Sequence, residues 1–228
     1  MSSGLDFFLF QIFPYIALGA CVLGTLLRFD RDPFSWRSKS SQLLRRRQLI
    51  WGSVLFHTGI LVILGGHFVG LLTPIAVFDA MGVSHGAKQI LAITAGGIAG
   101  IFCLVGLLLL LHRRLFDPRI RANSSFADIA VLFLLLSQLL IGLCTITVSM
   151  QHLDGHEMVK FMEWAQHIVT FRGGAHEFIA DTALVFKLHI TLGLFILLVF
   201  PFTRLVHMLS APLGFVFRPY QIVRKRAS

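Results

Sequence analysis

Four histidines lie inside long apolar stretches of the sequence, where a titratable side chain is unusual. His57 and His67 belong to the segment FHTGILVILGGHFVG, which begins at Phe56, and His189 and His207 belong to a later apolar stretch. Ionisable groups at membrane depth are costly and tend to be functional, and imidazole is a common axial ligand of haem iron. A single such histidine is also explained by a hydrogen bond to a neighbouring helix, but two stretches with two histidines each favour metal ligation.

The spacing of the histidines restricts which of them could share an iron. On an α-helix, His57 and His67 would lie about 15 Å apart, and His189 and His207 about 27 Å apart. Both axial nitrogens must lie about 2 Å from the iron, as in other imidazole–metal bonds. Any site with two histidine ligands must therefore join one stretch to the other.

The composition indicates that these stretches belong to a membrane protein. The 228 residues are 56% hydrophobic and only 14% charged, with a mean hydropathy of +0.79, whereas a soluble domain carries about a quarter charged residues. Apolar runs of about 20 residues can cross a bilayer as helices, and helices satisfy their own backbone groups in lipid. We therefore expect an all-α integral membrane protein, with residues 1–228 forming a single transmembrane domain. Five transmembrane helices are expected, at residues 7–27, 50–73, 89–111, 127–149 and 182–209.

The basic residues are distributed unevenly between the two sides of the membrane. Sixteen Lys and Arg follow the first and third expected helices or lie in the C-terminal tail, against three on the opposite side, at Lys88, Lys160 and Arg172. Cytoplasmic loops carry an excess of Lys and Arg, so we expect the N-terminus outside and the C-terminus in the cytoplasm. The same asymmetry accounts for the net charge of +9, and we expect no nucleic-acid partner.

Membrane depth then selects the partners of each histidine. The second expected helix runs outward, so His57 lies near the cytoplasm and His67 near the outside, whereas the fifth runs inward from His189 to His207. Histidines of like depth give two axial pairs, His57/His207 and His67/His189, and so two haems stacked across the membrane. The spacings of about 15 and about 27 Å do not match well, and we expect helix tilt and a kink at Pro201 to absorb part of the difference.

Small residues flank the second of these histidines. Gly65 and Gly66 precede His67 and Gly70 follows it, which predicts a notch where a flat macrocycle could lie against the backbone. The segment AGGIAG at residues 95–100 predicts another small-residue surface, on the third helix. Close helix packing of the small-xxx-small type is the alternative explanation of both.

Longer motifs make the chain resemble a known family. The motifs are FPYIALG, RFDRDPFSWRSKSSQ, LFHTGIL, GHFVGLLTP, AGGIAG, RRLFDPRIRA, QHLDG, WAQHIVTFRGGA, KLHITLG and FPFTRLVH. Over essentially its whole length the chain resembles the gamma subunits of respiratory nitrate reductase, which are di-haem cytochrome b membrane anchors. The haem-ligand motifs of the family match at His57, His67, His189 and His207 with the same pairing, and no ligand position departs from the pattern.

The resemblance implies a subunit that oxidises quinol in the bacterial or archaeal plasma membrane, where lipid surrounds it. Electrons would pass through two haem b groups to an iron–sulfur beta subunit and a molybdenum-containing alpha subunit on the cytoplasmic face, while protons leave on the outer side. The haems are expected to be held non-covalently, since the sequence has no CxxCH motif. The family has a quinol-contacting lysine at the position of Lys88, so the resemblance implies a catalytic Lys88, with room for the ring at Gly66.

Arginines lie close in sequence to the expected cytoplasmic ligands. Arg113, Arg114 and Arg204 either anchor the helix ends on the cytoplasmic side or pair with haem propionates, because guanidinium–carboxylate contacts are strong. Arg113 and Arg204 are the candidates for the second role.

Two other functions stay open on the sequence. A related di-haem anchor could feed a sulfur-compound or heterodisulfide reductase, and the ligands alone do not separate it from a nitrate reductase anchor; the loop motifs favour the latter. A haem-free transporter or ion pathway could use the histidines as a proton relay. Transporters often show inverted repeats and broken helices, and no repeat is present here.

Overall fold

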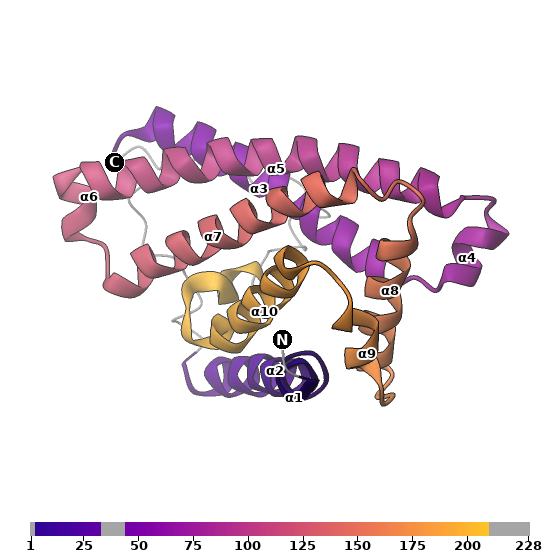
Figure 1. The fold of residues 1–228 in the computed structure, drawn as a ribbon. Helices are drawn as coiled ribbons and strands as arrows, with labels where there is room; N and C mark the ends of the chain where they lie inside the picture. The colour runs from indigo at the N-terminus through magenta and orange to yellow at the C-terminus, as the bar shows by residue number, and fades with distance from the viewer. Residues whose placement is uncertain (1–2, 33–43, 210–228) are drawn as a thin grey trace, which may run out of the picture.

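The computed structural model describes residues 3–32 and 44–209 (Figure 1). Within these ranges the protein is helical, without a strand, and contains five helices that are long and apolar enough to cross a membrane. These helices span Gly4–Arg31, Arg46–Leu72, His85–Phe116, Phe126–Ser149 and Leu184–Phe202. The basic segment 33–43 and the tail from residue 210, on which part of the charge asymmetry rests, lie outside the described residues.

The first four expected helices are present, and each extends up to five residues beyond an expected boundary. They are α1–η1–α2 (Ser3–Phe7, Phe8–Ile12 and Phe13–Arg31, one continuous helix), α3 (Arg46–Leu72), α5 (His85–Phe116) and α7 (Phe126–Ser149). Polar caps set two of the starts. Ser84 Oγ accepts a hydrogen bond from the backbone N–H of Ala87 at the start of α5, and Ser125 forms a reciprocal capping box with Asp128 at the start of α7, so these helices begin before their apolar stretches.

The fifth expected helix is not continuous, which corrects the expected range 182–209. Helix α10 (Leu184–Val199) is followed by two 3₁₀ turns, η3 (Phe200–Phe202) and η4 (Arg204–Met208), with Thr203 in an extended conformation between them. Pro201 has no N–H to donate and its ring conflicts with the preceding turn, so the α-helix ends here instead of kinking. Gly24 of α2 lets Pro201 approach closely, because a Cβ at Gly24 would lie 2.7 Å from Cγ of Pro201.

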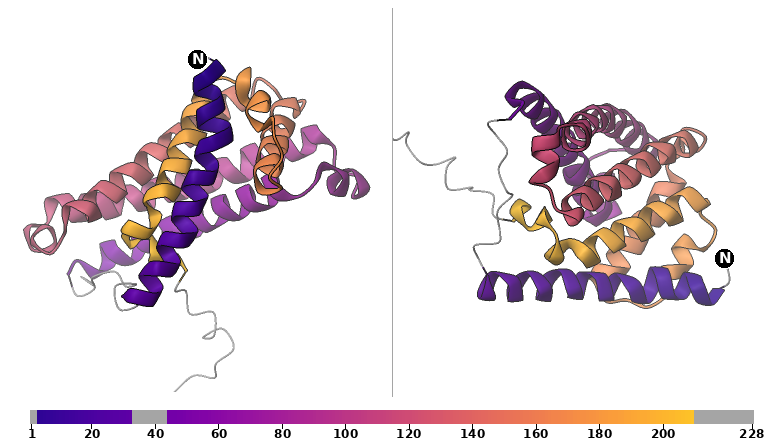
Figure 2. Two further views of the ribbon diagram at one scale, coloured as in Figure 1. Left: turned by 90° about the horizontal axis from the view of Figure 1, so that it is seen from below. Right: turned by 90° about the vertical axis from the view of Figure 1, so that its left-hand side faces the viewer.

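The long helices form two layers (Figure 1). Helix α3 packs along α5, α7 lies between α5 and α10, and α2 runs along α10 on the other side. The views in Figure 2 show the α2–α10 layer crossing beneath the others. A buried ion pair between Asp6 Oδ2 and Lys187 Nζ, 3.1 Å long, also joins α1 to α10.

Glycines allow the close packing of α3 against α5. A Cβ at Gly106 of α5 would collide with the backbone nitrogen of Phe56 and lie 2.8 Å from the carbonyl oxygen of Gly52, and one at Gly59 would lie 2.5 Å from that of Ala99. In the AGGIAG segment only part of the surface is packed: a Cβ at Gly100 would lie 2.6 Å from a methyl of Leu143 in α7, whereas one at Gly96 would meet nothing within 4 Å. The small residues thus serve helix packing at some positions and not at others.

Short helices cover the two ends of the bundle. One end, called here the Lys88 end, carries the starts of α5 and α10 together with α4 (Ile75–Ala80), α8 (His156–Val169) and α9 (Ala175–Ala180). The other, the Arg204 end, carries the start of α7, the turns η3 and η4, and α6 (Pro118–Ala122). The long connection 150–181 is therefore largely helical, and α8 buries Met162, Ala165 and Ile168.

Candidate functional site

The four membrane histidines form two ring pairs, one toward each end of the bundle. His57 of α3 and His207 of η4 have ring centroids 6.4 Å apart, with ring planes at 75°. His67 of α3 and His189 of α10 have centroids 6.1 Å apart, with planes at 42°. These are the two combinations that membrane depth predicts. Each joins α3 to the last helical segment, which is α10 with the turns η3 and η4 that follow it.

Both separations suit a metal held between two imidazoles. Such a metal lies about 2 Å from each nitrogen and the ring centre about 1 Å further back, so two coordinating rings have centres about 6 Å apart. The observed 6.1 and 6.4 Å fit this geometry. Across the described residues, no three His, Cys, Asp or Glu side chains gather at one point; each pair offers two axial ligands, and a haem brings four nitrogens of its own.

Hydrogen bonds orient three of the four rings. The Nδ1 atoms of His57, His67 and His207 lie 2.7, 2.8 and 2.5 Å from the carbonyl oxygens of Ser53, Ile63 and Arg204, within the same segment. A carbonyl accepts only, so each Nδ1 carries the proton and donates it. Each Nε2 then keeps its lone pair, the state that a metal-ligating histidine needs.

His189 is held differently from the other three. Its buried Nδ1 has no hydrogen-bond partner among the described residues, while Gln138 Nε2 of α7 donates to its carbonyl oxygen at 3.1 Å and lies 3.4 Å from its ring Nε2. The ring lies against Gly142 of α7, where an added Cβ would be 2.8 Å from Cε1. Gly142 thus leaves the space that the ring occupies.

The end of α10 at Val199 removes the spacing problem of His207. The value of about 27 Å assumes a continuous α-helix from His189, but residues 200–208 form 3₁₀ turns that change the direction of the chain. Arg28 of α2 supports this turn, because its Nη1 donates to the carbonyl oxygens of Pro201 at 2.6 Å and Thr203 at 2.7 Å. This change of direction brings the His207 ring to within 6.4 Å of the His57 ring of α3.

The glycines around His67 border open space. A Cβ at Gly65, Gly66 or Gly70 would meet nothing within 4 Å. Within the described residues, these three glycines therefore make no close contact with a neighbouring helix. The surface next to His67 is therefore open at the backbone and leaves room for another group.

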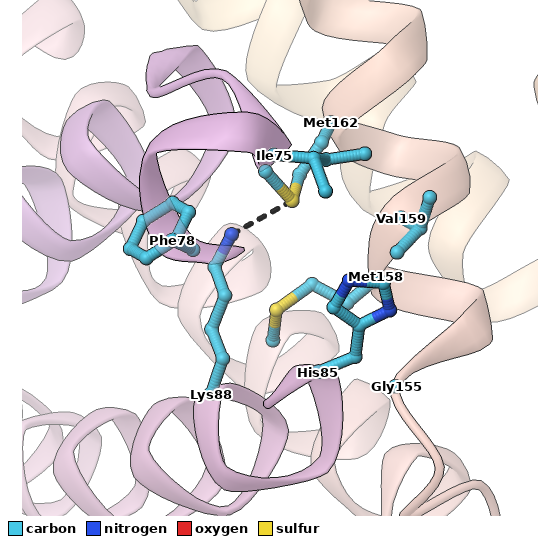
Figure 3. Close-up of a pocket in the computed structure, with 8 residues that line it drawn as sticks. All are labelled: Ile75, Phe78, His85, Lys88, Gly155, Met158, Val159 and Met162. Atoms are coloured by element: carbon cyan, nitrogen blue, oxygen red, sulfur yellow. Dashed lines mark hydrogen bonds between the residues drawn. The ribbon is translucent and has the colours of Figure 1, made fainter. Parts of the chain in front are cut away.

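Lys88 is buried near the His67 pair and does not extend to the surface. It is 8% exposed, and its Nζ donates to the carbonyl oxygen of Gly70 at 3.0 Å, one turn beyond His67, and to Sδ of Met162 at 2.7 Å. The ammonium also lies 3.8 Å from the centre of the Phe78 ring. Figure 3 shows the small pocket around it, which has mainly apolar walls. The residues lining this pocket are Ile75, Phe78, His85, Lys88, Gly155, Met158, Val159 and Met162.

The two candidate arginines contact protein groups at the Arg204 end. Arg113 Nη2 donates to the carbonyl oxygen of Leu44 at 2.7 Å. Arg204 Nη2 lies 2.6 Å from Oδ1 of Asp128, and the buried Nε of Arg204 has no hydrogen-bond partner among the described residues. One N–H of Arg204 thus remains available to an acceptor such as a haem propionate.

Sequence reasoning missed several side chains that surround the candidate residues. Asp128 carries a signal that could have been used, because SFAD before an apolar run is a capping-box pattern with an acidic residue at the level of the arginines. Gln138, Arg28 and Met162 carry no comparable signal. Their roles depend on contacts with residues at least 50 positions away in the chain.

Comparisons with known proteins give consistent results. The family described as nitrate reductase gamma subunit matches residues 6–226. Over 226 residues the chain is 48% identical to the respiratory nitrate reductase 2 gamma chain of Escherichia coli (strain K12), covering 99% of this chain and 100% of that protein. It is 47% identical over 222 residues to the respiratory nitrate reductase 1 gamma chain of the same strain, covering 97% and 98%. The nitrate reductase gamma chain of Bacillus subtilis (strain 168) is 40% identical over 219 residues, covering 96% and 98%.

Proposed function

The chain belongs to the family of nitrate reductase gamma subunits, and from this premise we propose that it oxidises quinol at the Lys88 end and passes the electrons to the Arg204 end. It is a subunit of a nitrate reductase complex and, with its five long apolar helices, a multi-pass membrane protein. The proposal rests above all on the two imidazole pairs, which lie at different levels between α3 and the last helical segment.

Each imidazole pair is proposed to hold one haem b. A bound haem supplies a one-electron carrier, and two in sequence supply a path along the bundle. The chain's own contribution is to fix the rings: Nδ1–H donation from His57, His67 and His207 to backbone carbonyls directs each Nε2 toward the ligand. The open surface at Gly66 and the buried Nε of Arg204 support binding of a flat ring with carboxylate side groups, and Arg113 is proposed to face the same carboxylates.

Lys88 is proposed to bind the quinol. Quinol oxidation releases two protons with two electrons, so it needs hydrogen-bonding groups close to an electron acceptor. The Lys88 ammonium is tied to Gly70, one turn from His67, and it can donate to a quinol oxygen and stabilise negative charge as the proton leaves. Its contact with the Met162 sulfur is weak for an ammonium and exchangeable, and Phe78 and the pocket methionines offer an apolar surface to the ring.

The direction of the reaction follows from the charge distribution. The Arg204 end carries the basic residues, so we assign it to the cytoplasm, where an iron–sulfur beta subunit and a molybdenum-containing alpha subunit would receive electrons and reduce nitrate. The Lys88 end then faces outward, and protons leave there. Movement of electrons inward and protons outward makes the reaction electrogenic across the plasma membrane.

A spectrum and four variants test the proposal. The reduced-minus-oxidised spectrum of the purified complex is expected to show two b-type haems per gamma chain. Replacing His67 or His189 with Ala should remove one of them, and replacing His57 or His207 should remove the other first. A haem-free spectrum would favour a proton relay, and loss of the same haem from His57 and His67 variants would contradict the pairing. A haem-loaded complex that does not reduce nitrate with quinol would instead favour a related reductase.

A further inference from the structure

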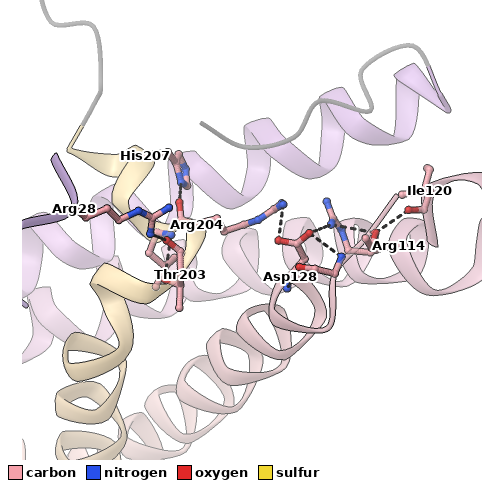
Figure 4. A network of polar contacts seen from close by, with 10 residues as sticks. Arg28, Arg114, Ile120, Asp128, Thr203, Arg204 and His207 are labelled. Carbon is pink, nitrogen blue, oxygen red and sulfur yellow. Dashed lines mark hydrogen bonds and ion pairs between the residues drawn. The ribbon is translucent and has the colours of Figure 1, made fainter. Parts of the chain in front are cut away.

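An aspartate is held between two arginines at the Arg204 end. Asp128 Oδ1 lies 2.6 Å from Arg204 Nη2, and its Oδ2 lies 3.4 Å from Arg114 Nη1 (Figure 4). The side chains of Asp128, Arg114 and Arg204 are 12, 13 and 20% exposed. Charges withdrawn from solvent to this degree are costly unless paired, so Asp128 is needed to keep the two guanidinium groups side by side.

The position of the Asp128 carboxylate is fixed by its own helix. The backbone N–H of Ser125 donates to Oδ2 of Asp128 at 3.1 Å, and the backbone N–H of Asp128 donates to Oγ of Ser125 at 3.2 Å. This capping box anchors the carboxylate to the first turn of α7, a helix of 24 residues. Arg204 is therefore paired with a group that a long helix holds in place.

Arg204 is the first residue of the short turn that carries His207. The turn η4 has only five residues, and the carbonyl oxygen of Arg204 accepts the hydrogen bond from His207 Nδ1. The preceding carbonyls of Pro201 and Thr203 are held by Arg28. A five-residue 3₁₀ turn has little rigidity of its own. Leu205 and Val206 anchor it in a hydrophobic cluster with Val131 of α7, and these two polar attachments, one to α2 and one to α7, orient its backbone.

We propose that Asp128 is a positioning residue for the haem site of His57 and His207, and that it acts through Arg204. The ion pair fixes the Arg204 guanidinium by Nη2, which leaves the buried Nε to donate to a haem propionate. It also fixes the Arg204 carbonyl that orients the His207 ring. The inference rests on the proposed function, because it requires a haem at this pair. Groups outside the coordinating shell that orient ligands in this way tune both affinity and redox potential.

Removing the carboxylate charge has two expected consequences. Arg114 and Arg204 would face each other without a counter-ion, so repulsion would move Arg204 and with it the turn η4. The local charge would also become more positive by one unit, which favours the reduced form of a haem whose iron loses a positive charge on reduction. Both consequences are confined to the His57/His207 site, since His67 lies in the last two turns of α3 and His189 in the first two turns of α10, toward the other end of the bundle.

Asp128→Asn in the purified complex tests the inference. Asn retains the size and an oxygen that can accept from Ser125, but not the charge. We expect the haem component that is missing in His207→Ala to fall in affinity by about tenfold or more, and its remaining fraction to titrate at a higher potential, while the other component is unchanged. Ser125→Ala is the matched control: it removes the hydroxyl that accepts from the Asp128 backbone but keeps the Ser125 N–H that holds the carboxylate and the Asp128–Arg204 pair, so both haems should titrate as in the wild type.

A double-mutant cycle separates a positioning role from general stabilisation. If Asp128 acts through Arg204, Arg204→Gln alone should lower the affinity for the same haem, and adding Asp128→Asn should lower that affinity little further. If Asp128→Asn fails to fold, Arg204→Gln still tests the inference, because it removes the same Asp128–Arg204 ion pair by changing the arginine. Additive losses of haem affinity, an equal effect on both haems, or wild-type potentials and occupancy in Asp128→Asn would each overturn the inference. A wild-type complex without haem would instead overturn the proposed function itself.

Discussion

At the scale of single residues, the four histidines differ in how firmly they are held. Three donate Nδ1–H to a carbonyl of their own segment, whereas His189 relies on contact with Gly142 and on Gln138. A ring without a hydrogen bond at Nδ1 is the weaker electron donor to a metal. The two pairs thus offer different environments, with the less constrained pair at the Lys88 end.

Lys88 is the residue whose replacement is expected to lower the rate of quinol oxidation most. Lys88→Ala should lower quinol oxidation by about 10²-fold or more, as for removal of a single donor that stabilises developing charge. Both haems should stay bound and accept electrons from a small artificial donor. Lys160→Ala is the matched control, because Lys160 lies on α8 at the same end and pairs with Glu157 instead of facing the pocket. Quinol turnover at the wild-type rate in Lys88→Ala would require another site.

The glycine beside His67 gives a test of the proposed ring surface. Gly66→Leu should fold normally, since a Cβ there meets nothing within 4 Å, but it should lower occupancy of the haem held by His67 and His189. Gly96→Leu is the control, because Gly96 of α5 also borders open space and is not next to a proposed ligand. Spectra of the two variants measure the difference. Equal haem content in both would show that the surface at Gly66 serves another purpose.

Residue types and spacing could predict which histidines meet, but not what supports them. His57, His67, His189 and His207 follow from their depth in apolar stretches, which is a property of the local sequence. The contact of Asp128 with Arg204, by contrast, joins positions 76 apart, and only the packing of α7 against the end of α10 brings them together. The family resemblance predicts a role for Lys88, but its burial against Gly70 and Met162 depends on the packing of α8 over it.

At the scale of elements, the break after α10 shows why helix length is a poor measure of ligand position. The apolar stretch continues past Pro201, so hydropathy predicts one helix over 182–209. Pro201 has no N–H for a helical hydrogen bond, and the α-helix ends at Val199. Arg28 then donates to the free carbonyl oxygens of Pro201 and Thr203, and the Thr203 hydroxyl accepts from the N–H of Leu205. Helices α8 and α9 give no long apolar signal and were missed for the opposite reason, because both are short and α8 is amphipathic.

Packing of α3 against α5 depends on glycine at the contact, which gives a prediction for stability. Gly106→Ala should destabilise the protein by about 1–3 kcal/mol or more, the usual cost of overpacking, because the new Cβ would collide with backbone atoms of Phe56 and Gly52 that cannot move away easily. Gly96→Ala adds the same methyl group to open space and should be neutral or slightly stabilising. Denaturation midpoints in detergent compare the two. A Gly106→Ala midpoint equal to that of Gly96→Ala would contradict the close approach of α3 and α5.

At the scale of the whole molecule, the two ends of the bundle are chemically different. The Arg204 end combines Arg28, Arg113, Arg114 and Arg204 around Asp128 and the break after α10, and the Lys88 end buries its lysine in an apolar pocket. This polarity is what the distribution of Lys and Arg along the sequence predicts. Sidedness itself stays a prediction, because helices alone do not define which end faces the cytoplasm.

Single-cysteine labelling tests this sidedness and, with it, the direction of proton release. In a background with Cys21, Cys103 and Cys144 replaced by Ser, Gly173→Cys would report on the Lys88 end and Asn123→Cys on the Arg204 end; both positions are exposed. An impermeant maleimide should label Gly173→Cys in intact cells, and Asn123→Cys only after the membrane is opened and the gamma chain is separated from its partners. The reason is that the basic end is retained on the cytoplasmic side. Labelling of Asn123→Cys in intact cells would reverse the assignment, and protons from quinol would then be released into the cytoplasm.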